Sequence, residues 1–167
     1  MPNERNIERG LIWYDAARWR AERISEQTGV PIRSVCGILS ALSVGVVWGT
    51  TVSQTEALCQ GLAQNVSTYG AQLGKALRIL GGAHPWRVLG KRAYKTRAFY
   101  LNILLPQRDT LVTIDRHILR AYSVNWPNLT AKRYRLLSDR IRQDAYDNVM
   151  LPHQWQAAVW LEQKGVK

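Results

Sequence analysis

Apolar residues return every three or four positions along most of this chain, and this helical spacing constrains its fold more than any other feature. Residues 7–27 show it best, because Ile, Leu, Ala and Trp alternate there with Arg and Glu as on an amphipathic helix. Gly29 suits the end of this helix, and Pro31 suits the first turn of a nearly all-apolar, central helix over residues 31–42. Residues 43–51 contain strand-forming valines but find no partner strand, so we interpret them as an exit loop. The sequence therefore predicts an all-α fold.

The same spacing, with Gly, Pro and Asn residues between the runs, predicts the remaining helices: residues 51–65, 71–80, 92–105, 113–122, 130–149 and 152–164, and a turn of helix at 86–89. At 167 residues the chain is long enough to bury a core of its own. We expect one compact domain over residues 1–167. A division into two lobes, residues 30–110 and residues 1–29 with 111–167, is the alternative within it.

Positive charge dominates the composition. The chain has 23 Lys and Arg against 12 Asp and Glu, and its formal net charge is +11. Residues 75–142 hold fifteen of the basic residues and only three acids, Asp109, Asp115 and Asp139. A solvated basic face is the simplest explanation of such an excess. Its steepness nevertheless favours phosphate binding, with nucleic acid as the leading partner and an acidic membrane surface as the second.

Cysteine and histidine usage does not indicate a metal or a cofactor. Cys36 and Cys59 lack a CxxC spacing and the three histidines are scattered, so we expect free thiols in a reducing cytoplasm and no metal site. Residues 34–55 carry no charge, but their apolar part, residues 35–48, is short and interrupted by Gly and Ser, as in a buried core helix. The N-terminus has no apolar signal region. We expect a soluble, cytoplasmic protein without a membrane partner.

Residues 89–123 are the most informative stretch, and Asp115 is its central residue. It stands between the apolar residues Ile114 and Ile118 and beside Arg116, where a helix is predicted to begin. A carboxylate there can cap the helix, because it accepts the unpaired N–H groups of the first turn. It can also form a structural ion pair, or face a nucleic-acid substrate as a partly buried anion. Spacing alone favours the cap or the ion pair over a catalytic role.

Three segments, taken in order, carry a resemblance to a known family. Residues 38–42 read ILSAL, residues 89–102 read LGKRAYKTRAFYLN, and residues 112–120 read VTIDRHILR. They resemble the patterns LLSAQ, LPGVGRKTANVVLN and VDTHIFR of the helix-hairpin-helix DNA glycosylases of the endonuclease III and MutY class. A weaker likeness in HQWQAAVWLEQKG, near the C-terminus, extends the resemblance over most of residues 35–164.

The resemblance implies the glycosylase fold, its activity and its site residues. Asp115 matches the family's catalytic carboxylate, which stabilises the oxocarbenium ion formed when an N-glycosidic bond breaks. Lys95 matches the lysine that attacks C1′ in bifunctional members, with a phosphate contact as an equal alternative. DNA contacts are expected from Lys91, Arg92, Arg97, Arg116 and Ser43, and from Leu42 as an apolar wedge. A flipped base is expected against Trp48, Tyr94, Phe99, Tyr100 and His117. The remaining tryptophans are expected in the core or between lobes: Trp13, Trp19, Trp155 and Trp160.

The chain also departs from the family pattern. Lys91 and Ala93 replace the two hairpin glycines, so side-chain cations would replace backbone contacts to a phosphate. The four iron–sulfur cysteines are missing, so no cofactor is expected. The short chain is similar to small phage-type members, some of them tied to thymine hypermodification. Double-stranded DNA is the expected partner of a monomer. The alternatives are a base-hypermodification transferase acting on modified thymine and a non-catalytic DNA-binding module.

Overall fold

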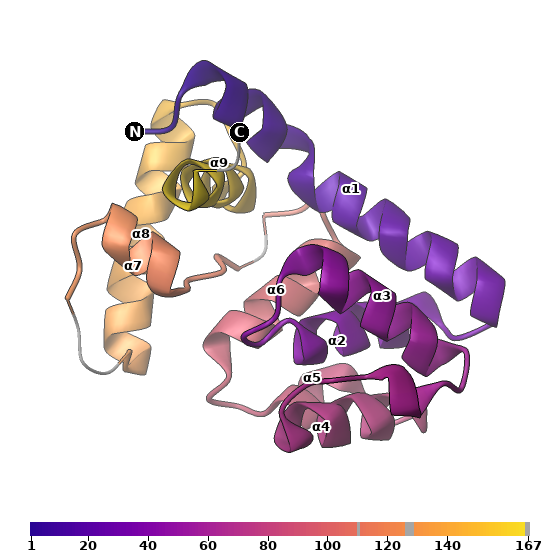
Figure 1. The fold of residues 1–167 in the computed structure, drawn as a ribbon. Coiled ribbons are helices and arrows are strands. Elements are labelled where there is room, and N and C mark those ends of the chain that lie inside the picture. Colours follow the sequence, from indigo (N-terminus) through magenta and orange to yellow (C-terminus); the bar gives the residue numbers. More distant parts are fainter. Residues whose placement is uncertain (110, 126–128, 166–167) are drawn as a thin grey trace.

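The computed structural model describes residues 1–109, 111–125 and 129–165, and these ranges are helical without strands, which confirms the all-α class. No helix within them combines the length and the apolar character needed to cross a bilayer. A short 3₁₀ turn, η1 (Ala63–Asn65), follows the third helix. Figure 1 shows the arrangement of the helices: α1 (Glu4–Thr28), α2 (Ile32–Leu42), α3 (Trp48–Cys59), α4 (Gly70–Leu80), α5 (Pro85–Leu89), α6 (Tyr94–Leu104), α7 (Arg116–Ala121), α8 (Ala131–Asp147) and α9 (Pro152–Lys164).

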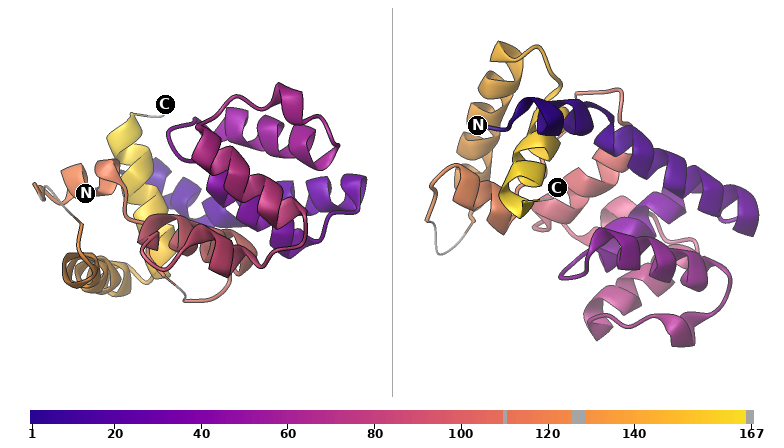
Figure 2. Two further views of the ribbon diagram at one scale, coloured as in Figure 1. Left: turned by 90° about the horizontal axis from the view of Figure 1, so that it is seen from below. Right: turned by 45° about the horizontal axis from the view of Figure 1, so that its top comes forward.

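The long helix α1 joins the two halves of the molecule. It begins after Asn3, whose side chain accepts the Asn6 N–H at 2.9 Å, and it ends at Gly29, whose φ of +72° suits glycine. Its first half lies along α9, and its second half lies over α2 and α6 (Figure 1, Figure 2). Gly10 permits a close approach to α9, because a Cβ at Gly10 would stand 2.7 Å from the backbone nitrogen of Ala158. Segments from opposite ends of the chain therefore lie side by side.

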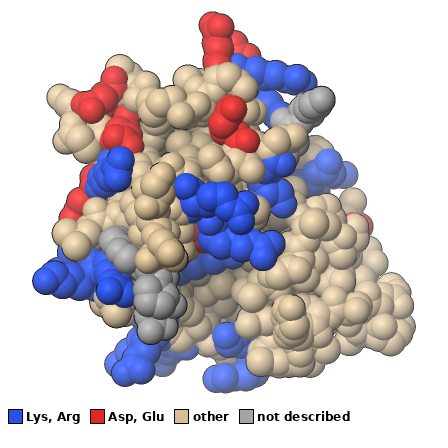
Figure 3. All heavy atoms as spheres, turned by 60° about the vertical axis from the view of Figure 1, so that its left-hand side comes forward, with Lys and Arg blue, Asp and Glu red and all other residues tan. Residues whose placement is uncertain are grey.

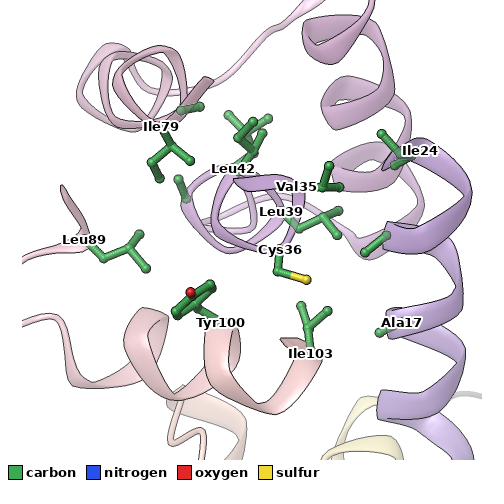
Figure 4. Close-up of a cluster of buried hydrophobic side chains, with 14 of the residues drawn as sticks. Ala17, Ile24, Val35, Cys36, Leu39, Leu42, Ile79, Leu89, Tyr100 and Ile103 are labelled. Atoms are coloured by element: carbon green, nitrogen blue, oxygen red, sulfur yellow. The ribbon is translucent and has the colours of Figure 1, made fainter. Parts of the chain in front are cut away.

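The first hydrophobic core surrounds α2. Every residue from Val35 to Leu42 is buried, as predicted for a central helix. Burial raises the pKa of the Cys36 thiol to about 12, and both Cys36 and the partly buried Cys59 are free. Figure 4 shows α2 enclosed by side chains of its neighbours: Ala17, Ile24, Ile79, Leu89, Tyr100 and Ile103.

The second core joins α7, α8 and α9. Its buried members include Val112, Ile114, Ile118, Leu137, Ile141, Ala145 and Trp155. The buried residues of α1 from Tyr14 to Ile24 belong to the first core, so residues 1–29 do not group with residues 111–167 alone. We refer below to the α2–α6 lobe (residues 32–104) and the α7–α9 lobe (residues 112–164), which α1 bridges.

Several helices start at other residues than predicted. α1 begins at Glu4 rather than at residue 7, and α6 begins at Tyr94 rather than at residue 92. The starts of α3 and α7 differ as well. α3 begins at Trp48 and ends at Cys59, so the exit loop of α2 covers only residues 43–47 and the predicted helix at 51–65 is shorter at its end. The helix predicted over 113–122 begins at Arg116. The cause is Tyr134, whose hydroxyl donates to the Val112 carbonyl and accepts the Ile114 N–H, so that residues 112–114 stay outside the helix.

Candidate active site

A cavity of about 520 Å³ lies where the two lobes face each other. Its lining comes from α1, the loop of residues 43–47, α3, Tyr69 at the start of α4, α6, residues 113–117 and α9. A volume of this size is typical of pockets that enclose a small ligand. Because both lobes and α1 contribute, the cavity depends on the tertiary packing of segments that are distant in sequence.

Asp115 is a helix cap and a cavity residue at once. Its Oδ1 accepts the N–H groups of His117 at 2.9 Å and Ile118 at 3.0 Å, as the cap interpretation predicted. Its Oδ2 accepts the indole N–H of Trp160 at 3.1 Å. Within the described ranges no Lys or Arg lies close enough to form an ion pair with it. The carboxylate is therefore held in a fixed orientation, and Oδ2 keeps a further acceptor position at the cavity.

Lys95 lines the same cavity from the first turn of α6. Phe99, one helical turn later, lies on the same face and also lines the cavity. The start of α6 is fixed to α2, because the Ser40 hydroxyl donates to the carbonyl of Thr96. Lys95 and Asp115, which come from different lobes and match two separate family patterns, thus share one cavity.

Aromatic rings form much of the cavity wall. The Trp13 ring centroid lies 5.3 Å from that of Trp48, 5.9 Å from that of Phe99 and 6.1 Å from that of Trp160. Lys164 Nζ stands 5.2 Å from the Trp160 ring centroid, within cation–π range. These rings meet at tilted or edge-on angles, and aromatic side chains in a cavity wall can stack on a planar ligand.

Three buried polar side chains, Tyr14, Thr113 and Gln156, line the most enclosed part of the cavity, and we call them the cavity floor. The Tyr14 hydroxyl lies 3.2 Å from Thr113 Oγ1 and 2.9 Å from Gln156 Oε1. Burial raises the pKa of the Tyr14 hydroxyl to about 12, so it stays protonated at neutral pH. The floor is polar although the walls are aromatic, and such a surface can both stack a ring and read its edge.

His117 lies beside Asp115 and lines the cavity. Burial lowers the pKa of its imidazole, and the neighbouring Asp115 charge only partly opposes that effect. Its Nδ1 is buried and has no hydrogen-bond partner among the residues described. The ring packs edge-on against Trp160 at 6.4 Å between centroids. His117 thus lies at the cavity, where a flipped base was expected to meet it, and its ring packs on the cavity wall.

The structure divides the predicted site residues into two groups. The cavity gathers seven of them: Ser43, Trp48, Lys95, Phe99, Asp115, Arg116 and His117. Leu42 is fully buried in the first core, so a wedge role for it is wrong in this structure. Tyr100 is buried in the same core and cannot touch a flipped base. Tyr94 points away from the cavity and packs on Tyr134, with 5.3 Å between ring centroids.

The predicted DNA contacts outside the cavity lie around the turn between α5 and α6. Lys91 and Arg92 are exposed there, and the positive φ of +91° falls on Gly90, one residue before the first glycine of the family pattern. Arg97 stacks on the Trp86 ring at 3.3 Å from its centroid. Figure 3 shows Lys and Arg gathered over the centre and lower edge of one face, whereas the right-hand side of that view is almost uncharged.

Sequence reasoning missed several lining residues. Trp13 and Trp160 line the cavity walls and Trp155 is buried, whereas Trp19 is 53% exposed, against the expected core or lobe contact. Gln156 also lines the cavity, and no sequence pattern predicted a role for it. The only sequence signal for Gln156 and Trp160 was the weak resemblance of the C-terminal segment. Both residues lie on α9, which packs against α1, and the spacing of residues along the sequence does not show that contact.

Comparisons with known proteins supply a family without an activity. A family model, described as a family of unknown function (DUF7178), matches residues 1–166. No curated protein and no solved structure matches the chain. The comparisons therefore assign no activity to the cavity.

Proposed function

The chain belongs to the DUF7178 family of unknown function, and we propose that it is a DNA N-glycosylase that flips a damaged or modified base into the cavity between its lobes and excises it. One observation carries this proposal: Asp115 and Lys95 line a single cavity whose walls are aromatic. A base must leave the duplex before its glycosidic bond can be attacked, and stacking side chains are what receives it.

The proposed reaction needs a fixed anion beside the sugar. When the bond between C1′ and the base nitrogen breaks, its electron pair leaves with the base and C1′ becomes cationic. Asp115 is suited to stabilise that charge, because three N–H donors hold its carboxylate and its Oδ2 remains open to the cavity. Water then adds to C1′ and gives its proton to the carboxylate. In the second route the Lys95 amine adds to C1′ instead of water and loses a proton; the C1′–O4′ bond then opens, O4′ takes up a proton, and a Schiff base between C1′ and Lys95 Nζ remains.

Positive charge supports DNA as the partner. The net charge is +11, and Lys91, Arg92 and Arg116 are exposed near the α5–α6 turn or the cavity. Cations in such positions neutralise phosphates and release counterions, so binding should weaken steeply as salt rises. We propose that double-stranded DNA is the partner and that the protein acts as a monomer.

A panel of duplexes tests the proposal directly. Substrates carry uracil, 5-hydroxymethyluracil, oxidised bases or phage-modified pyrimidines, and the expected product is a free base with an abasic site. Borohydride traps a covalent adduct when Lys95 attacks C1′. Lys95→Gln should remove that adduct, whereas Lys132→Gln, at an exposed position on α8 outside the cavity, should keep it. Binding to DNA without release of any base would contradict the proposal, and if no base is modified either, it would indicate a non-catalytic module.

Trp160→Phe is expected to slow excision about 10-fold, because it removes an N–H donor to a carboxylate but keeps an aromatic wall. Single-turnover rates on the best substrate measure the effect. The matched control is Trp155→Phe, which removes an indole hydrogen bond to the Tyr122 hydroxyl inside the second core. Trp155→Phe should lower the melting temperature and leave the excision rate almost unchanged. If Trp155→Phe and Trp160→Phe slowed excision equally, Trp160 would have no specific role at Asp115.

The size of the cavity favours a second candidate function. At about 520 Å³ it offers more space than an unmodified nucleobase fills, so it has room for a base with a large substituent. A transferase that displaces a leaving group on a modified thymine would use that room and leave the glycosidic bond intact. Mass spectrometry of the nucleosides separates the two: a heavier base supports the transferase, and an abasic site supports the glycosylase.

A further inference from the structure

A chain of hydrogen bonds runs beneath the cavity. Asn102 Nδ2 donates to Thr113 Oγ1 at 3.1 Å, and the Tyr14 hydroxyl donates to Gln156 Oε1 at 2.9 Å. Thr113 Oγ1 and the Tyr14 oxygen are 3.2 Å apart. A phenol has one hydrogen, and because its shorter contact is to Gln156, the Thr113 hydroxyl supplies the hydrogen between them. All four side chains are more than nine-tenths buried, so this chain is shielded from competing water.

This arrangement fixes the orientation of the Gln156 carboxamide. The Tyr14 hydroxyl occupies its oxygen, and no residue in the described part of the chain accepts a hydrogen bond from its Nε2 group. Gln156 lines the cavity, so the NH₂ group is what it offers to a ligand. Leaving an enclosed donor without an acceptor is costly. A ligand that fills the cavity floor is therefore expected to bring an acceptor to Gln156.

The position of Gln156 determines which part of a flipped base it meets. It precedes Trp160 by one turn on the same face of α9, about 6 Å along the axis, and Trp160 holds Asp115. When the sugar lies at Asp115, the edge of the base that is farthest from its glycosidic bond therefore faces Gln156. There thymine and uracil carry O4 and guanine carries O6, whereas cytosine and adenine carry an amino group.

We propose that Gln156, held by Tyr14, makes this site selective for keto bases, which present a carbonyl oxygen at that edge, over the corresponding amino bases. The inference rests on the proposed base-flipping function and names its substrate class. A keto oxygen accepts the Gln156 N–H, whereas an amino group places two donors against each other. Specificity then resides in one amide, whose direction is set by residues from α1, α6 and the segment before α7.

Two pairs of matched substrates test the proposal. 5-Hydroxymethyluracil and 5-hydroxymethylcytosine share the 5-substituent and differ at the edge that would face Gln156. Uracil and cytosine differ at the same edge and carry no 5-substituent. The wild-type protein should excise the keto member of each pair about 10- to 100-fold faster. Gln156→Glu replaces the NH₂ with an acceptor, so this ratio should fall at least 10-fold. Tyr14→Phe removes the hydrogen bond to Gln156 Oε1, so the amide can rotate, and this variant should also lower the ratio of the keto to the amino excision rate. Gln163→Glu, an exposed position on the same helix, is the control and should leave the ratio unchanged.

Equilibrium binding of the same duplex pairs by the Asp115→Asn protein, with and without Gln156→Glu, supplies a readout without turnover. Three outcomes would overturn keto selectivity and leave the glycosylase proposal standing. They are equal excision rates for the keto and the amino member of a pair, a ratio of these rates that Gln156→Glu and Tyr14→Phe leave unchanged, and a preference for amino bases. No base release, combined with keto-selective binding that depends on Gln156, would overturn excision and support the selectivity. No release and no selective binding would overturn both. Melting curves show whether a variant that has lost the keto preference is still folded.

Discussion

Asp115→Asn is expected to slow base excision about 100- to 1000-fold while leaving the fold intact. The carboxylate charge opposite the developing cation is lost, and removing one such electrostatic group from an enclosed site lowers a rate about 100- to 1000-fold. Asparagine caps a helix as well as aspartate does, so the bonds to the N–H groups of His117 and Ile118 can persist. Single-turnover release of the base, with far-ultraviolet circular dichroism and melting curves alongside, measures both sides of this expectation.

Asp139→Asn is the matched control, because Asp139 is an exposed acid on α8 outside the cavity. It should retain the wild-type rate. Asp115→Ala should lose activity together with about 1 kcal/mol of stability, since it removes the cap as well as the charge. Full excision by Asp115→Asn would refute the assigned role of the carboxylate and, with it, the mechanism.

Local structure was predictable because its signals are local. α9 runs over Pro152–Lys164 as the sequence indicated, and Gly29 ends α1 with a positive φ. Asp115 caps α7, as one of the alternatives held. One exception was the start of α7, which Tyr134 delays through hydrogen bonds to residues 112 and 114 from a helix about twenty residues later in the chain. A side chain that competes with the backbone in this way leaves no trace in the spacing of α7 itself.

Side-chain direction was partly available from the sequence. Lys95 and Phe99 are four residues apart on α6 and therefore share a face, whereas Tyr94 and Tyr100 cannot lie on it with them. The structure follows that rule, since Lys95 and Phe99 line the cavity. For Leu42 the sequence offered less, because a fully apolar helix such as α2 has no polar face from which an outward direction can be inferred.

The pairing of distant helices was not predictable from spacing. Trp13 and Trp160 lie near opposite ends of the chain, yet their ring centroids are 6.1 Å apart. The floor has the same origin, because Tyr14 of α1 bonds Gln156 of α9. Periodicity indicates that α1 has a buried face, but it does not say which helix covers that face. The cavity walls and the selectivity of the floor therefore emerge only with the packing of α1 on α9.

Gly10→Val is accordingly expected to lower the free energy of unfolding by about 3 kcal/mol or more, above the common range for overpacking, because the obstruction is backbone. A Cβ at Gly10 would stand 2.7 Å from the Ala158 nitrogen and 2.8 Å from the Gln154 carbonyl oxygen, and neither can rotate away. Relief requires α1 and α9 to separate, which moves Trp13 and Tyr14 away from Trp160 and Gln156. Denaturant unfolding measures the loss, and the rate and the keto preference should fall together.

Gly74→Ala separates this packing effect from helix propensity. Gly74 lies within α4, and a Cβ there meets nothing within 4 Å, so alanine should raise the free energy of unfolding by about 1 kcal/mol. Both substitutions add a side chain to a helical glycine, yet their expected effects have opposite signs because only Gly10 faces another backbone. Equal stability of Gly10→Val and the wild type would mean that α1 and α9 do not cross closely in solution. The shared floor of Tyr14 and Gln156 would then lose its structural basis.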